Sequence, residues 1–377
     1  MLGLVGLGLA GCGTRARSQA VAGQAVTGQA PAAGDGLGVL ARSRGISFGT
    51  AVQGELLGRD PVYAAAVTAE AQLLVPEWEA KWDALQPREG EFDFGPLGIV
   101  ASFAQAQRKQ LRGHALVWHQ AMPDWLAPAL AEGPARARAV MAAHVEGVLG
   151  ATQPVIRDWD VVNEVLANPP GSRFTEQTPA RGIFRDTPWL RALGPDYIEL
   201  ALRLARERDR TLRLTLNDYG LEGDTPWAEQ KRQAMLSLVR ALLAARCPLD
   251  AVGLQAHLQV DEPFRPEPLA GFIQALRGMG LSVLITELDV REGANLPPGL
   301  EARDAVVAAY VQQVVGTALA AGCRTVLTWG LSDRDSWLLR DPDVVRRDGQ
   351  QHRGHPLDAE FRRKAMWQAL ARSFAGG

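Results

Sequence analysis

Residues 228–257 read AEQKRQAMLSLVRALLAARCPLDAVGLQAH, a helix pattern followed directly by a strand pattern. Over 228–246 the apolar residues recur at i, i+3, i+4 and i+7, the spacing of a helix that covers a sheet. The short apolar run at 250–257 then ends in two polar side chains, Gln255 and His257. One such helix-and-strand unit favours an α/β fold.

The same unit repeats on both sides of this stretch. Helical patterns also lie at 196–209 and 301–322, between short apolar runs that are typical of strands. The strand predictions are 46–51, 72–75, 111–118, 155–163, 211–217, 250–257, 282–288 and 324–330. Eight units in about 330 residues predict an α/β protein built as one (β/α)8 TIM barrel with loop insertions. A doubly wound open sheet is the alternative.

Polar or aromatic side chains stand at the ends of six of these strands. They are His114, Trp118 and His119; Asn163 and Glu164; Asn217, Asp218 and Tyr219; Gln255 and His257; Glu287 and Asp289; and Trp329. A polar group at the end of an apolar strand is costly unless it faces solvent or a ligand. In a TIM barrel these ends meet at one face, where such enzymes hold their active sites. The plainer alternative is that each residue begins a surface loop.

Composition and charge exclude several classes of function. The formal net charge of −2 predicts no attraction to nucleic acid or to an anionic membrane. The histidines lack the spacing and acidic neighbours of a metal site, so no metal is predicted, and no other cofactor is expected. Of the three cysteines, Cys247 and Cys323 are predicted to be buried thiols.

The N-terminus has the pattern of a targeting signal rather than of a folded element. Residues 1–12 read MLGLVGLGLAGC, and the last four resemble a bacterial lipobox in which Cys12 receives a lipid, although a basic leader is missing. We expect export to the periplasm, the cell surface or the medium, with membrane contact only through this lipid. Residues 13–43 are rich in Gly, Ala, Gln and Ser and predict a flexible linker. Ordered structure is expected from near Gly45, as one catalytic domain over 45–375 and as a monomer.

Six motifs in order resemble those of family 10 glycoside hydrolases, the TIM-barrel xylanases, from about Gly45 to Phe374. They are KWDALQPREGEFDF (81–94), GHALVWH (113–119), WDVVNE (159–164), GLQAHL (253–258), ITELDV (285–290) and TWGLSDRDSWL (328–338). The resemblance implies an endo-β-1,4-xylanase that acts on xylan and xylo-oligosaccharides with retention. It implies Glu164 as the acid/base and Glu287 as the nucleophile, with the carboxyl groups about 5–5.5 Å apart.

The resemblance also implies supporting roles. His257 would hydrogen-bond the nucleophile and be oriented by Asp289, and Asn163 and Gln255 would donate near the 2-hydroxyl of the sugar at the cleavage point. Substrate-binding roles would fall to Glu77, Lys81, His114, Trp118, Trp329 and Trp337, with Asn217 and Tyr219 on the leaving-group side. Trp329 and Trp337 would leave no room for a hydroxymethyl group and so favour xylose over glucose.

Two departures from the family pattern affect substrate binding. Trp78 stands where the family usually has an asparagine that binds a distal sugar, and Gln120-Ala121 shifts a glutamine next to Trp118 by one position. Two other functions stay open: a related β-1,4-glycanase acting on short xylo-oligosaccharides or mixed glucans, and a glycan-binding lipoprotein without turnover. The paired glutamates argue against the last, because binding alone does not require an acid and a nucleophile.

Overall fold

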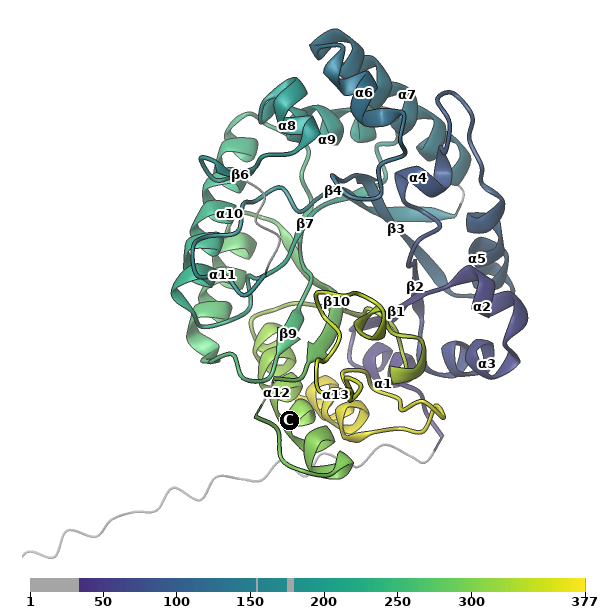
Figure 1. Ribbon diagram of the computed structural model, residues 1–377, viewed down its shortest axis with the longest axis vertical. Coiled ribbons are helices and arrows are strands. Elements are labelled where there is room, and N and C mark those ends of the chain that lie inside the picture. Colours follow the sequence, from purple (N-terminus) through teal and green to yellow (C-terminus); the bar gives the residue numbers. More distant parts are fainter. Residues whose placement is uncertain (1–33, 154, 175–179, 294, 377) are drawn as a thin grey trace, which may run out of the picture.

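The computed structural model describes residues 34–153, 155–174, 180–293 and 295–376, which form a closed barrel. Eight parallel strands follow one another in the order β11-β1-β2-β3-β4-β7-β8-β10, and β10 pairs with β11 to close the ring. Figure 1 shows the strands around the centre and the helices outside them. The predicted (β/α)8 TIM barrel is confirmed.

The strands of the ring are short and buried on both faces. They are β1 (Ser47–Val52), β2 (Leu73–Pro76), β3 (Gln110–Val117), β4 (Ile156–Asn163), β7 (Arg213–Asp218), β8 (Ala251–Leu254), β10 (Ser282–Arg291) and β11 (Thr325–Thr328). Three shorter strands lie outside the ring: β5 (Ala180–Arg181), β6 (Phe184–Arg185) and β9 (His257–Gln259), the last paired with β10.

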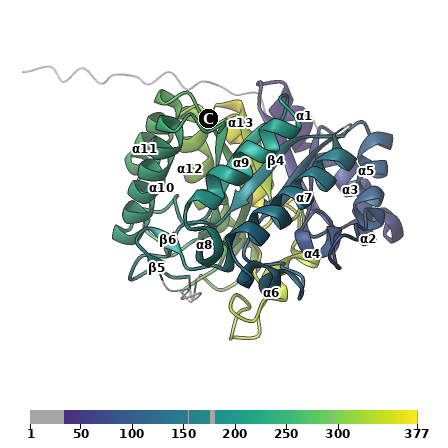
Figure 2. The same cartoon turned by 90° about the horizontal axis from the view of Figure 1, so that it is seen from above.

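Helices surround the sheet, as the view turned by 90° also shows (Figure 2). They are α1 (Leu37–Arg42), α2 (Gly54–Arg59), α3 (Pro61–Glu70), α4 (Trp82–Leu85), α5 (Gly95–Ala106), α6 (Leu126–Ala131), α7 (Pro134–Thr152), α8 (Pro188–Leu193), α9 (Asp196–Arg208), α10 (Pro226–Ala244), α11 (Pro266–Gly278), α12 (Leu300–Ala320) and α13 (Ala365–Ala375), with short 3₁₀ turns at Asp333–Asp335 and Trp337–Leu339. Helix α9 shows the principle: Ile198, Ala201, Leu202 and Ala205 share one face, and all four are fully buried.

Ordered structure begins earlier than the sequence predicts. Helix α1 lies inside the predicted linker, and its residues Leu37 and Ala41 are fully buried. The Leu37 amide donates to Glu70 Oε2 at 2.8 Å, and the Trp367 indole donates to the same oxygen at 2.9 Å. The expected start near Gly45 is therefore wrong, because two apolar residues four apart suffice to dock one helical turn. The lipobox-like segment with Cys12 lies outside the described residues.

Strand bounds follow the prediction except at strands six and seven. The predicted strand 250–257 divides into β8 and β9, because Ala256 adopts a left-handed conformation with φ of 58°. Strand β10 continues three residues beyond the prediction, to Arg291. Cys247 and Cys323 are buried free thiols, as predicted. No helix within the described ranges is long and apolar enough to cross a membrane.

Candidate active site

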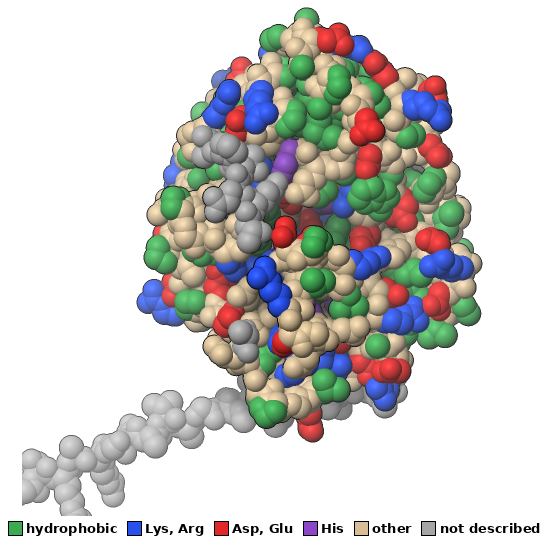
Figure 3. All heavy atoms as spheres, viewed as in Figure 1, with side chains coloured by type: hydrophobic (Ala, Val, Ile, Leu, Met, Phe, Trp, Pro, Cys, Tyr) green, Lys and Arg blue, Asp and Glu red, His purple; other side chains and the backbone are tan. Residues whose placement is uncertain are grey.

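A cavity of about 820 Å³ opens at the carboxyl ends of the barrel strands. Figure 3 shows this face hollowed near its centre, with acidic and histidine side chains in and beside the hollow. Eleven of the predicted site residues line the cavity: Glu77, Lys81, His114, Trp118, Glu164, Tyr219, Gln255, His257, Glu287, Trp329 and Trp337. Seven separate strand ends therefore contribute to one cleft, as the barrel prediction requires.

Glu164 directly follows β4 and is 7% exposed. Its φ of 58° is rare for a residue with a side chain. Its Oε1 accepts hydrogen bonds from Gln255 Nε2 at 3.0 Å and from Asn163 Nδ2 at 3.3 Å. Because both donors point at Oε1, Oε2 is the oxygen free to carry and deliver a proton.

Glu287 lies within β10 and is 4% exposed. Its Oε1 accepts from Asn217 Nδ2 at 2.7 Å, and its Oε2 lies 3.2 Å from His257 Nε2. With a donor at each oxygen, the carboxylate is fixed in orientation.

His257 connects Glu287 to Asp289. The His257 Nδ1 lies 2.9 Å from Asp289 Oδ1, and the Trp337 indole donates to the other oxygen of Asp289. Burial opposes the charged imidazole, but Asp289 and Glu287 outweigh it and raise the pKa of His257 to about 10. Burial raises the pKa of Asp289, but the charge and hydrogen bond of His257, together with His355 and the Trp337 indole, outweigh burial and lower this pKa. His257 is thus a cation at neutral pH and donates to both carboxylates.

Lys81 and Glu77 lie at the β2 end of the cleft. Lys81 is 8% exposed, and its ammonium lies 4.8 Å from the ring centre of Trp118 and 5.7 Å from that of Trp329. Glu77 accepts from Gln53 Nε2 at 2.9 Å. Burial raises the pKa of Glu77 and lowers the pKa of Lys81, so both charges are poorly hydrated and available to a ligand.

His114 reaches the floor of the cleft from β3. Its Nδ1 lies 3.0 Å from Asp160 Oδ2 and 3.8 Å from Glu287 Oε1, and its ring packs edge-on against Trp329 at 5.0 Å. Asp160 also accepts from the buried Arg112, which fixes the histidine from behind. In the part of the chain that the structure describes, no group of three His, Cys, Asp or Glu side chains is arranged to hold a metal ion.

Comparison with known proteins gives the chain its family. The model of glycosyl hydrolase family 10 matches residues 36–373, nearly all of the described chain. This chain belongs to glycosyl hydrolase family 10. The match begins at the residue before α1, in agreement with the early start of the fold.

Several relatives in family 10 cover most of the chain. Endo-1,4-β-xylanase 1 of Humicola insolens is 31% identical over 91% of this chain and 75% of its own length. Endo-1,4-β-xylanase A of Fusarium oxysporum is 33% identical over 70% of this chain and 77% of its own length.

Solved structures of xylanases also resemble this chain. An endo-1,4-β-xylanase of Penicillium canescens matches with a TM-score of 0.78 and 26% identity over 90% of this chain and 98% of that one. A mutant of an intracellular xylanase from Thermoanaerobacterium saccharolyticum, solved with xylotetraose, matches with a TM-score of 0.75 and 26% identity over 89% and 98% of the two chains.

Asn217 departs from its predicted role on the leaving-group side. It is fully buried and does not line the cavity. Its Nδ2 donates to Glu287 Oε1 and, at 2.9 Å, to Asn163 Oδ1, while its own Oδ1 accepts from Thr286 Oγ1 at 2.7 Å. Asn217 is therefore occupied in holding the nucleophile. Asn163, 2% exposed, likewise lies behind Glu164 rather than on the cavity wall.

Tyr219 does line the cavity, opposite the Lys81 end. Its hydroxyl accepts from Asn168 Nδ2 at 2.8 Å and from Arg185, and its ring lies 4.3 Å from that of Phe174. Arg185 Nε also donates to the backbone oxygen of Glu164 at 3.1 Å, so the acid/base and this wall are braced together.

Both departures from the family pattern lie on the cleft. Trp78 is 52% exposed, lines the cavity, and has the Lys81 ammonium 5.3 Å from its ring centre. Gln120 and Ala121 also line the cavity, and Ala121 takes a left-handed conformation with φ of 47°.

Sequence reasoning missed several residues of the cavity wall, among them Gln53, Phe174, Arg291, Arg340 and Asp341. A signal existed for two of them. Gln53 is the polar residue that directly follows β1, and Arg291 shares the inward face of β10 with Glu287 and Asp289 at a spacing of two. Phe174, Arg340 and Asp341 belong to long loops, for which strand periodicity gives no information.

Proposed function

We propose that this chain is an endo-1,4-β-xylanase that hydrolyses internal xylosidic bonds with retention. One observation supports this most strongly: two buried carboxyl groups, from β4 and β10, face the same cleft in unlike environments. Glu287 has donors at both oxygens and a cationic histidine beside it, whereas Glu164 has donors at one oxygen only. Such a division is what an acid and a nucleophile require.

The first half of the reaction follows from these contacts. Glu287 attacks the anomeric carbon while Glu164 Oε2 gives its proton to the leaving oxygen, and a covalent glycosyl-enzyme forms. In the second half Glu164, now a carboxylate, takes a proton from water, and the water oxygen displaces Glu287. His257, held at Nδ1 by Asp289, orients Glu287 as the leaving carboxylate as well as the attacking one.

Trp329 and Trp337 account for a preference for xylose over glucose. Both line the cavity, Trp329 against His114 and Trp337 against His257, whose ring lies 5.1 Å away at a steep angle. These rings occupy the space beside the cleavage point where a hydroxymethyl group would lie.

The test distinguishes the roles of Glu164 and Glu287 by comparing substrates whose leaving groups do and do not need a proton. On xylan, Glu164→Ala and Glu287→Ala should each lower sugar release by about 10³-fold or more. On an aryl xylobioside with an acidic phenol, Glu164→Ala should still release phenol in a rapid burst, because that leaving group needs no proton. Glu287→Ala should release none. Sugar release from soluble cellulose but not from xylan would point instead to a β-1,4-glucanase. If the wild type binds xylan but releases no sugar, the protein is a glycan-binding protein and not an enzyme.

We also propose export, lipid attachment at Cys12 and a monomeric state. The support for export and lipid attachment is the sequence LAGC at 9–12, which resembles a bacterial lipobox. Expression with radiolabelled palmitate in a bacterial host should label the wild type and not Cys12→Ala. Light scattering of the folded domain should give the mass of one chain.

A further inference from the structure

Arg291 is the last residue of β10 and lines the cleft. Its guanidinium lies 5.2 Å from the ring centre of Trp337 and 5.8 Å from that of Phe174. It therefore stands between two aromatic side chains, on the wall that leads from the cleavage point toward Tyr219. None of the reaction steps described above uses it.

Within the part of the chain that the structure describes, the Arg291 cation has no acidic partner. Among the described residues, Arg291 makes no ion pair, and its Nε is buried without a hydrogen-bond partner. Burial, followed by repulsion from Arg173, lowers the pKa of Arg291 to about 10, while Asp289 and Asp341 act in the opposite direction. A sheltered charge without a partner costs free energy unless a ligand supplies one.

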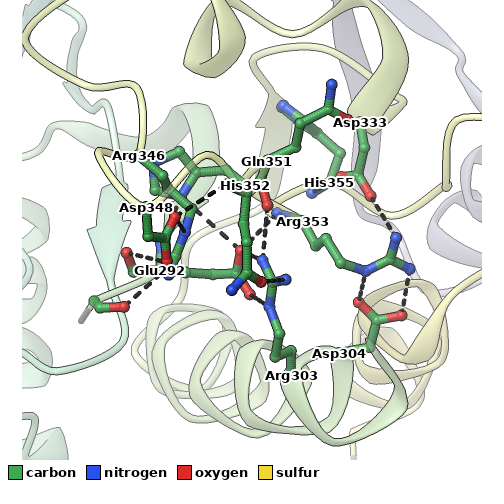
Figure 4. A network of polar contacts seen from close by, with 12 residues as sticks. Glu292, Arg303, Asp304, Asp333, Arg346, Asp348, Gln351, His352, Arg353 and His355 are labelled. Atoms are coloured by element: carbon green, nitrogen blue, oxygen red, sulfur yellow. Dashed lines mark hydrogen bonds and ion pairs between the residues drawn. The ribbon is translucent and has the colours of Figure 1, made fainter. Parts of the chain in front are cut away.

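Other sheltered arginines of the chain show what a structural role looks like. Figure 4 shows the network on the outer side of the same strand end, where Arg303 forms a bidentate pair with Glu292, and Arg353 pairs with Asp304 at 2.7 Å. Arg112 in the barrel likewise pairs with Asp158 and Asp160. Glu292 directly follows Arg291 at the end of β10, yet of these two charged residues only Glu292 has an ion-pair partner among the described residues.

We propose that Arg291 binds the carboxylate of a uronic acid carried as a side group on the xylan chain. An arginine fork matches a carboxylate with two parallel hydrogen bonds, and flanking aromatic rings hold the guanidinium flat for it. Phe174 and Trp337 offer apolar faces to the sugar that bears the acid. Arg173, 4.3 Å from the Phe174 ring but paired with Glu262 at 3.3 Å, adds positive potential at the same place. This proposal rests on the proposed xylanase function.

A matched pair of substrates isolates the effect of the carboxylate charge on hydrolysis. One is a xylo-oligosaccharide with a single uronic acid side group, and the other is the same compound after reduction of its carboxyl group to an alcohol. The wild type should hydrolyse the acidic compound with a kcat/KM about tenfold higher, the effect of one charged hydrogen bond. Arg291→Met should bring this ratio close to one. The control Arg88→Met removes the same charge from an exposed site outside the cavity and should keep the wild-type ratio.

Salt provides an independent measurement on the unaltered protein. Raising NaCl from about 0.05 M to about 1 M should lower the wild-type ratio several-fold, because the Debye length falls below about 4 Å. If Arg291→Met unfolds, the salt titration and a second variant, Arg291→Lys, test the proposal instead. Arg291→Lys keeps the charge but loses the two parallel hydrogen bonds, so it should give an intermediate ratio.

Three outcomes would overturn the proposal: a wild-type ratio near one, a ratio that Arg291→Met leaves intact, or equal losses on both substrates, which would make Arg291 a ligand of neutral sugars. Hydrolysis of unsubstituted xylo-oligosaccharides by the wild type tests the proposed xylanase function independently of the uronate site. If that activity is present and the ratio is one, only the uronate site fails.

Discussion

Glu287 is restrained by two different kinds of donor. The amide of Asn217 holds Oε1 and the imidazolium of His257 holds Oε2, and Asp289 in turn neutralises the imidazolium. The neutral donor fixes direction, and the charged donor also stabilises the anion. At the residue scale, therefore, the nucleophile depends on partners that never touch the sugar.

His257→Gln should lower kcat on xylan by about 10²-fold, the usual effect of losing one charge-stabilising donor. The substitution keeps a side chain that can donate one hydrogen bond but removes the positive charge beside Glu287. Initial rates at saturating substrate measure the change. A kcat within a factor of two of the wild type would show that the charge on His257 is irrelevant to the reaction.

The same residue predicts a pH dependence of stability. Folding raises the pKa of His257 from 6.5 to about 10. A raised pKa contributes stability that is fully present below pH 6.5 and is lost as the pH rises through about 10. Between these limits the free energy of unfolding should fall more steeply for the wild type than for His257→Gln, by more than about 1 kcal/mol. Urea unfolding at pH 6.5 and pH 9.5 gives both slopes, and parallel slopes would contradict the assignment.

Trp78 offers a flat apolar face at the Lys81 end of the cleft. Trp78→Asn, which restores the usual family residue, should raise the KM for xylo-oligosaccharides of four or more sugars by about fivefold, because a sugar ring loses its stacking partner. The KM for an aryl xylobioside should change less. An unchanged KM for the long substrates would mean that the exposed ring takes no part in binding.

Close contacts between strands are what bring these residues together at the element scale. A Cβ on Gly253 in β8 would lie 2.1 Å from Asn217 Oδ1 and 2.9 Å from Thr286 Cγ2. Only a glycine allows β7, β8 and β10 to approach so that Asn217 reaches Glu287. The backbone of β8 is thus part of what positions the nucleophile.

Gly253→Ala should therefore reduce both activity and stability. The added methyl group must displace Asn217, which lowers kcat, and it should cost about 1–3 kcal/mol of unfolding free energy. Gly271→Ala is the control, since a Cβ there meets nothing within 4 Å and lies inside α11, so it should be neutral or slightly stabilising. Wild-type kcat in Gly253→Ala would contradict the role given to Asn217.

Helix α1 predicts the shortest chain that keeps full stability. A chain that begins at Gly34 keeps Leu37, Ala41 and the hydrogen bond to Glu70, whereas a chain that begins at Gly45 loses them. The shorter chain should melt several degrees lower, because apolar contacts are removed and the buried Glu70 loses a donor. Equal melting temperatures in differential scanning calorimetry would show that α1 contributes nothing.

At the scale of the whole molecule, ring closure makes distant segments meet. Glu164 follows β4 and Glu287 lies within β10, two strands far apart in sequence, and the barrel order brings both side chains to one cleft. The sequence was sufficient to predict this, because strand periodicity, strand count and polar strand ends are all local patterns. The contacts that the family motifs implied for His257, with Glu287 and with Asp289, are present in the structure, while the catalytic roles of these residues stay predictions.

Other features depend on three-dimensional contacts that no local pattern records. Asn217 ends its strand like a substrate ligand, but its distance to Asn163, Thr286 and Glu287 makes it a support instead. The unpaired state of Arg291 is visible only once every neighbouring carboxylate is placed. The docking of α1 was hidden because the surrounding composition is typical of a linker.

Proton NMR of the first sugars released from a xylo-oligosaccharide tests the central claim most directly. If Glu287 forms a covalent bond to the sugar and Glu164 then activates water, the new reducing ends appear first as the β-anomer and turn to the equilibrium mixture by mutarotation. An α-anomer as the first product would mean a single displacement by water, and the roles given to Glu164 and Glu287 would then be wrong.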